Sequence, residues 1–229
     1  MIDTFGATDW APLWLSLRVA SQATVAATLL GVAGAYLLSR PRLPGRRLLE
    51  AIASLPIVLP PTVLGYYLLV SIGRRSPIGR AWESVVGSPL VFTPTAAVIA
   101  ATLASTPFCL RAARGAISDV DRRLEDAARV AGLSEPAVVL RVTLPLARRG
   151  IVAGIALAFA RALGDFGTTI MVAGNVPGRT QTMPIAVFDR VQAFDYATAG
   201  LLAAILSLVA VAATATERRR RRRRDLSQG

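Results

Sequence analysis

Residues 125–145 read EDAARVAGLSEPAVVLRVTLP, a polar stretch with helical patterning that lies between two long apolar segments. Its first half continues a run of apolar side chains at helical spacing, formed by Val120, Leu124, Ala127, Ala128 and Ala131. Gly132 stands where a helix would stop, because glycine adopts the left-handed conformation without steric cost. Ser134 can cap a second short helix, which Pro145 is expected to end. The stretch therefore predicts a helix–turn–helix hairpin between two membrane segments.

The two flanking segments belong to a set of five apolar runs, each long enough to cross ~30 Å of hydrocarbon as a helix. The runs are residues 13–38, 48–72, 92–110, 151–173 and 196–216. Their residues do not alternate as membrane β-strands do, and backbone polar groups in lipid must bond internally. The predicted fold is an all-α integral membrane protein with about five transmembrane helices. We expect one membrane domain over 1–216, a loop at 111–149 within it, and an arginine-rich tail at 217–229.

The arginines predict how the chain is oriented. All 26 basic residues are arginine; segments 39–50, 111–149 and 217–229 carry 4, 8 and 7 of them. The N-terminal segment and loops 73–91 and 174–195 carry 0, 3 and 2. Because positive charge accumulates on the cytoplasmic side, the N-terminus is expected outside and the C-terminus inside. This orientation places the 125–145 hairpin and the tail in the cytoplasm.

The composition argues against several classes of protein. The net charge of +12 is explained by arginines that contact the anionic head groups of the lipid bilayer, so no nucleic-acid partner is expected. Histidine is absent and Cys109 is the single cysteine, which removes the commonest metal ligands and acid–base groups. No phosphate-binding GxxxxGK[ST] loop occurs either. We therefore predict no catalytic residue, no metal site, no cofactor and no ATPase site in this chain.

The second apolar run is interrupted. Residues 55–62 read LPIVLPPT, with three prolines in six positions, so the helix must kink or unwind there. Broken helices at membrane depth pack against protein or line a wet cavity. Pro60, Pro61 and Thr62 are therefore candidates for the border of a transport path. A kink that only shapes helix packing is the alternative.

The fourth apolar run carries a charge at membrane depth. Residues 159–169 read FARALGDFGTT. Inserting the charged Asp165 into the membrane costs free energy unless its side chain faces the interior of the helix bundle. Arg161 lies four residues earlier on the same helical face and can neutralise it. Gly164 and Gly167 would allow another backbone to approach closely. Arg161, Asp165, both glycines and the adjoining Thr168 are candidates for a path or gate. An internal ion pair that orders the fold is the alternative.

The hairpin sequence resembles a known motif. Glu125-Asp126-Ala127-Ala128, Gly132 and Leu144-Pro145 are similar to the EAA loop in permease subunits of bacterial ABC importers. The resemblance implies that these seven residues couple the membrane domain to a separate ATP-hydrolysing subunit. Asp126 stands where that family often has glutamate, so either Asp126 or Glu125 carries the acidic role.

Three further stretches resemble one branch of that family. LPPTVLGYY at 59–67, GDFG at 164–167 and GNVPGRTQT at 174–182 look like molybdate permeases, with sulfate permeases as close relatives. The resemblance implies ATP-driven import of molybdate or tungstate across the bacterial plasma membrane. It also implies an ABC ATPase subunit, an extracytoplasmic anion-binding protein and a second copy of this chain as partners. The alternatives are a sulfate or thiosulfate importer and an ATP-independent channel or secondary transporter.

Overall fold

The computed structural model describes residues 10–39 and 44–225, with the side chains of these residues up to position 213. Within this part the regular elements are all helices, which confirms the predicted all-α class. The helices are α1 (Ala11–Ser39), α2 (Arg46–Val58), α3 (Pro61–Ile72), α4 (Pro77–Val86), α5 (Pro94–Ser118), α6 (Arg122–Val130), α7 (Glu135–Val138), the π-helical turn η1 (Val139–Thr143), α8 (Leu144–Leu163), α9 (Gly167–Ala173), α10 (Met183–Gln192) and α11 (Tyr196–Asp225).

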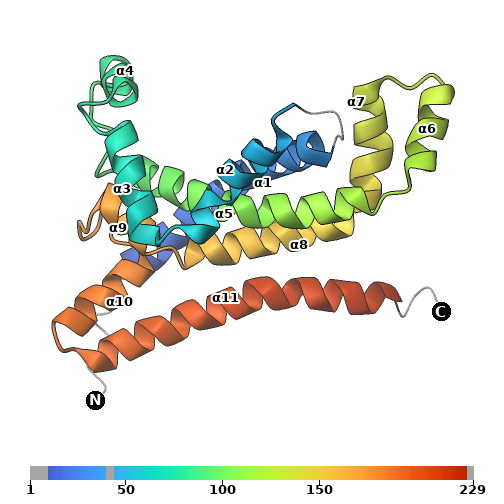
Figure 1. The fold of residues 1–229 in the computed structure, drawn as a ribbon. Helices are drawn as coiled ribbons and strands as arrows, with labels where there is room; N and C mark the ends of the chain where they lie inside the picture. Colours follow the sequence, from blue (N-terminus) through green and yellow to red (C-terminus); the bar gives the residue numbers. More distant parts are fainter. Residues whose placement is uncertain (1–9, 40–43, 226–229) are drawn as a thin grey trace.

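The long helices α1, α5 and α8 pack side by side and form the centre of the molecule (Figure 1). Their contacts are built from alanine and glycine, including the fully buried Ala27, Ala104 and Ala158. A Cβ on Gly31 would lie 3.0 Å from the Cβ of Cys109, and one on Gly154 would lie 3.0 Å from the Cβ of Ala112. Small side chains therefore let the three backbones approach closely, as is usual for helices that pack in lipid.

The second apolar run is broken, as its prolines predict. Helices α2 and α3 meet at an angle of 116°. The last helical bond of α2 runs from the N–H of Leu59 to the carbonyl of Leu55. Pro60 and Pro61 have no N–H to continue the ladder, so the chain turns and α3 begins at Pro61. In the described residues four helices are long and apolar enough to cross a membrane, or five if α2 and α3 count as one span.

The prediction that Pro145 ends the second short helix is wrong. Helical backbone continues from Glu135 to Leu163 through Pro145. The turn before it is wide, because the N–H of Leu144 bonds to the carbonyl of Val139, five residues back. A π-helical turn makes room for the proline ring, and Pro145, which has no N–H to donate, marks the point where the helix bends. The helix therefore changes direction here instead of stopping (Figure 1).

Other boundaries also differ from the predicted runs. The fourth run, 151–173, is divided into α8 and α9 by a break at residues 164–166. The loops predicted at 73–91 and 174–195 contain the short helices α4 and α10. The arginine-rich tail predicted at 217–229 continues α11 as far as Asp225, and residues 226–229 lie outside the described part.

Candidate coupling hairpin and membrane junction

The hairpin predicted from residues 125–145 is formed by α6 and α7. The carboxylate of Asp121 accepts a hydrogen bond from the N–H of Arg123 and caps α6. Gly132 has a φ of 87°, the left-handed value that the sequence predicts, and turns the chain between the two helices. Ser134 occupies the predicted cap position of α7, but its side chain makes no capping hydrogen bond.

Arg129 joins the two helices of the hairpin. Its Nε donates to Oε1 of Glu135 at 2.6 Å, and its Nη1 donates to Oδ1 of Asp126 at 2.6 Å. Its Nη2 lies 3.7 Å from Oε2 of Glu125. The hydrogen bond to Glu135, followed by the one to Asp126, raises the pKa of Arg129 above its ordinary value. The guanidinium therefore stays charged and holds α6 against the start of α7.

The two candidate acidic residues point to different surroundings. Oε1 of Glu125 accepts a hydrogen bond from the hydroxyl of Thr143 at 2.6 Å, and the Glu125 side chain is 19% exposed. The Asp126 side chain is 69% exposed and pairs with Arg129. Glu125 thus bonds to the π-helical turn at the base of the hairpin, whereas the more exposed Asp126 pairs with Arg129.

The rest of the predicted coupling set lies on or near the hairpin surface. Ala127 and Gly132 are exposed and Ala128 is half-buried, while Val130 beside them is 90% exposed. Leu144 is half-buried and Pro145 is exposed at the start of α8. The hairpin therefore presents small and apolar groups outward, where another protein could contact them.

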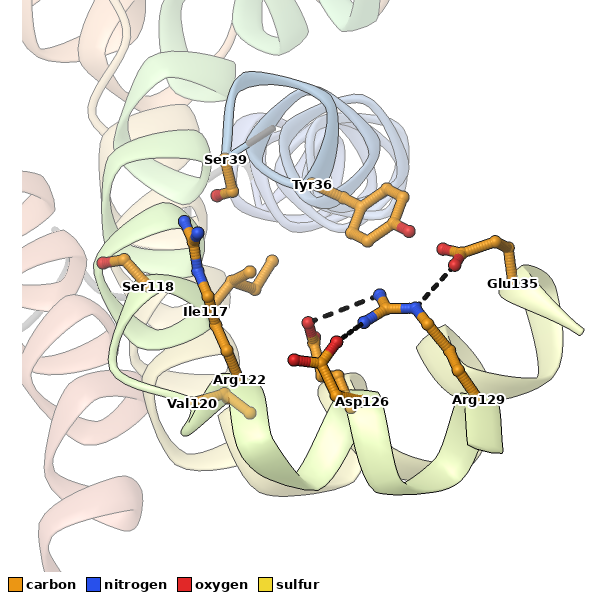
Figure 2. A pocket seen from close by; sticks show the side chains of 10 residues that line it. Tyr36, Ser39, Ile117, Ser118, Val120, Arg122, Asp126, Arg129 and Glu135 are labelled. Atoms are coloured by element: carbon orange, nitrogen blue, oxygen red, sulfur yellow. Dashed lines mark hydrogen bonds and ion pairs between the residues drawn. The ribbon is translucent and has the colours of Figure 1, made fainter. Parts of the chain in front are cut away.

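A cavity of about 580 Å³ lies on the inner side of the hairpin. Figure 2 shows Tyr36 and Ser39 of α1 and Ile117 and Ser118 of α5 on one side of it. The charged side chains of Arg122, Asp126, Arg129 and Glu135 come from the hairpin. Glu125 also lines the cavity. The cavity lies between the hairpin and the ends of α1 and α5.

A second cluster surrounds Asp165, which is 2% exposed at the end of α8. Its Oδ1 accepts from Nη1 of Arg161 at 2.8 Å and from the hydroxyl of Thr168 at 3.3 Å. Its Oδ2 accepts from the backbone N–H of Thr169 at 3.0 Å and from the Thr169 hydroxyl at 2.8 Å. The predicted pair with Arg161 is therefore present. Through its bonds to Thr169 the carboxylate also caps the first turn of α9. Thr169 is not among the residues singled out from the sequence.

The break in α2–α3 packs against this cluster. A Cβ on Gly167 would lie 2.8 Å from the Cβ of Pro61 and 3.3 Å from the N of Thr62. Gly65 of α3, which the sequence argument did not single out, has the same role, because a Cβ there would lie 2.7 Å from the Cβ of Met171. The close approach predicted at Gly167 is thus present. At Gly164 the nearest atom to such a Cβ is the carbonyl oxygen of Ala160 in the preceding turn.

The structure therefore gathers the predicted path residues at one junction. Pro60, Pro61 and Thr62 are exposed beside Gly167, and Arg161, Asp165 and Thr168 are hydrogen-bonded next to them. In the part of the chain that the structure describes, no group of three or more His, Cys, Asp or Glu side chains is placed to hold a metal ion. The junction places a buried ion pair beside the first turn of α9.

The known proteins that this chain resembles are membrane components of transport systems. The family described as the binding-protein-dependent transport system inner membrane component matches residues 27–222. The molybdenum transport system permease protein ModB of Escherichia coli (strain K12) is 44% identical over 184 residues, which cover 80% of each chain. The putative molybdenum transport system permease protein YvgM of Bacillus subtilis (strain 168) is 41% identical over 177 residues, 77% of this chain and 78% of that one. The probable sulfate transport system permease protein cysT of Nephroselmis olivacea is 36% identical over 194 residues, 83% of this chain and 68% of that one.

Solved structures share the fold. A bacterial ABC transporter involved in the import of the acidic polysaccharide alginate superposes with a TM-score of 0.70 at 13% identity, over 97% of this chain and 82% of that one. The MetNI methionine ABC transporter in an inward-facing conformation superposes with a TM-score of 0.65 at 18% identity, over 90% of this chain and 93% of that one. At these identities the likeness concerns the fold alone. The extent of the family match settles the wider assignment: this chain belongs to the inner membrane components of binding-protein-dependent transport systems.

Proposed function

We propose that this chain is the permease subunit of an ATP-driven molybdate importer. The observation that carries the proposal is the 44% identity to a molybdenum permease over 80% of both chains. The protein from Nephroselmis that is named for sulfate transport is less similar, at 36% identity. Tungstate, which is close to molybdate in size and charge, is expected to share the path, and sulfate or thiosulfate is the second candidate cargo.

The hairpin is the proposed contact for a separate ABC ATPase subunit. Its outward surface carries Ala127, Val130 and Gly132, and the sequence offers no phosphate-binding loop of its own. ATP binding and hydrolysis in the partner would move the hairpin and thereby open the membrane domain to one side at a time. In this proposal the chain is a transport subunit that performs no chemistry.

The arrangement of the helices supports the predicted orientation. The beginning of α2, the α6–α7 hairpin and the C-terminal end of α11 lie at one end of the molecule (Figure 1). These are the arginine-rich segments, so this end would face the cytoplasm of the bacterial cell. Helices α4 and α10 lie at the other end (Figure 1), where an extracytoplasmic anion-binding protein would deliver its ion.

A second copy of this chain is the proposed partner within the membrane. Helix α2 has no buried residue, and Leu55, Val58, Tyr66 and Tyr67 on α2 and α3 are large and exposed. Two copies related by a two-fold axis along the membrane normal would enclose a path between them. Pro60, Pro61 and Thr62 would border it, together with Arg161, Gly164, Asp165, Gly167 and Thr168.

Reconstitution in vesicles tests the proposed function. Vesicles that contain the permease with its ATPase and binding protein should accumulate radiolabelled molybdate when ATP is supplied. Vesicles with the permease alone should remain closed to molybdate, and excess sulfate should compete poorly. Uptake that persists without the ATPase would favour a channel or secondary transporter and overturn the proposal. Preferential uptake of sulfate would show that sulfate, and not molybdate, is the transported ion.

A further inference from the structure

A second cavity, of about 400 Å³, lies between α2 and the last turns of α5. Its volume is within the range of ~300–1,000 Å³ that is usual for small-molecule sites. The described residues that line it include none from the α6–α7 hairpin and none from the cluster around Asp165. The lining side chains that matter here come from three helices: Leu38 of α1, Glu50 and Ser54 of α2, and Leu110, Arg111 and Arg114 of α5.

Positive charge exceeds negative charge at this α2–α5 cavity. Nη2 of Arg114 lies 2.9 Å from Oε1 of Glu50, and Nε of Arg46 donates to the same oxygen at 2.7 Å. Nη2 of Arg111 donates to the hydroxyl of Ser54 at 3.2 Å, and in the part of the chain that the structure describes it pairs with no carboxylate. Three guanidinium groups therefore share one carboxylate, which leaves two positive charges uncompensated.

The two arginines that line the cavity are suited to a phosphate group. They are three residues apart on α5, so their side chains leave the helix on the same face. A guanidinium has more N–H donors than the single bond from Arg111 to Ser54 uses, and its planar fork matches the oxygens of a phosphate. A bound phosphate anion would also balance the excess positive charge.

The position of the cavity along the helices favours the phosphate of a lipid over a dissolved ion. Leu38 and Leu110 are the last residues of the first and third apolar runs, and Arg111 follows directly. The cavity therefore lies where hydrocarbon gives way to head groups. Leu38 is buried and Leu110 is half-buried, so the wall contains apolar as well as cationic side chains. A phospholipid combines the same two characters at its glycerol phosphate.

The cavity can be reached from outside the molecule. Arg111, Gly115 and Ser118 border it, share one face of α5 and are exposed. A lipid in the bilayer could thus enter from the side without unfolding any helix.

We propose that the α2–α5 cavity binds the phosphate of an anionic phospholipid, with Arg111 and Arg114 as the residues that hold it. Ser54 and Glu50 on α2 orient these two guanidinium groups, so the bound lipid would also join α2 to α5. The inference is independent of the transported ion and of the ATPase, because it rests only on this cavity and on the membrane location of the chain.

The test is native mass spectrometry of the full-length protein in detergent, titrated with phosphatidylglycerol or with zwitterionic phosphatidylcholine. The unaltered protein should bind a single phosphatidylglycerol molecule per chain in preference to phosphatidylcholine. Arg111→Gln should weaken this binding about tenfold, as expected for the loss of a hydrogen bond between charged groups. Should Arg111→Gln fail to accumulate in the membrane, Arg114→Gln provides the same test, because Glu50 keeps Arg46 as its partner.

Arg47→Gln is the matched control. Arg47 is exposed in the first turn of α2 and is not among the described residues that line the cavity, so its loss removes the same charge from the same end of the helix. Binding of phosphatidylglycerol should be unchanged in this variant. Equal losses in Arg47→Gln and Arg111→Gln would show a general attraction between arginines and anionic lipid, and would overturn the proposal of a defined site.

Inorganic phosphate and molybdate, added as competitors, separate a lipid from a dissolved ion. Neither should displace phosphatidylglycerol. Displacement by either ion would show that the cavity takes the dissolved ion, and would overturn the lipid assignment. Equal binding of the two lipids, or no retained lipid because a second copy of the chain closes the cavity, would overturn it as well. None of these outcomes bears on molybdate uptake, so the proposed function stands or fails separately.

Discussion

At the scale of single residues, the structure shows how a carboxylate is retained inside an apolar bundle. Both oxygens of Asp165 accept hydrogen bonds, from Arg161, Thr168 and Thr169. Buried charges are tolerated when they are paired and their lone pairs are satisfied. The contacts with α9 favour a structural role for Asp165. The guanidinium of Arg161, with a side chain that is 24% exposed, remains the candidate for contact with an anion.

A double-variant experiment separates these two roles. Asp165→Asn keeps an oxygen for the N–H of Thr169 but leaves Arg161 uncompensated, so the free energy of unfolding should fall by about 2 kcal/mol. Arg161→Gln combined with Asp165→Asn should recover most of that loss, because no unpaired charge remains. We expect molybdate uptake to stay low in the double variant, since the positive charge is gone. Thermal unfolding in detergent and uptake in vesicles provide the two measurements, and full uptake by the double variant would reduce the pair to a structural role.

At the scale of elements, two broken helices meet. The break between α2 and α3 packs on the break between α8 and α9, through Pro61 against Gly167 and through Gly65 against Met171. Interrupted helices are typical of substrate paths in transporters. The hairpin is a third irregular element, and its turn depends on the positive φ of Gly132.

The Gly132 turn can be tested through its backbone conformation alone, because a Cβ at this position would meet nothing within 4 Å. Gly132→Val should misalign α6 and α7, since a β-branched residue in the left-handed region costs ~1–2 kcal/mol or more. We expect the ATPase to copurify poorly with this variant. Gly132→Asn is the control, because asparagine tolerates this conformation, and it should retain binding. Equal copurification with both variants would show that the turn does not position the contact surface.

At the scale of the whole molecule, the arginine-rich segments and the hairpin share one end (Figure 1). Cysteine labelling can test which side this end faces, because the native Cys109 is buried. Val130→Cys, at a position that is 90% exposed on the hairpin, should react with a membrane-impermeant maleimide only in inside-out vesicles. Val85→Cys, at a position that is 85% exposed on α4, should react only in intact spheroplasts. The reverse pattern would invert the orientation and exclude the hairpin as the ATPase contact.

Much of this architecture follows from sequence because its physical causes are local. Prolines interrupt α2–α3, glycine turns the hairpin, and the four-residue spacing of Arg161 and Asp165 forms their ion pair. The continuation through Pro145 could not be predicted, because it depends on a π-helical turn whose Thr143 is held by Glu125 from another helix. The role of Gly65 likewise depends on which helix lies opposite.

The short helices α4 and α10 could have been found from their first residues. Helix α4 begins at Ser76-Pro77, where the Ser76 hydroxyl accepts from the N–H of Gly79, and α10 follows Thr182 with Pro184 in its first turn. A capping residue followed by proline is a recognised helix start. Sequence reasoning that counted only long apolar runs passed over both.

The alanine and glycine contacts between α1, α5 and α8 limit how the protein can change shape. The backbones of the three helices lie so close that a Cβ at Gly31 or Gly154 would approach atoms of α5 to about 3.0 Å, so we expect these helices to move together. The three helices would therefore rock as a single rigid body during transport. The change in shape would be confined to the helix breaks around these three helices. These are the break between α2 and α3 at the prolines, the α8–α9 connection and the base of the hairpin.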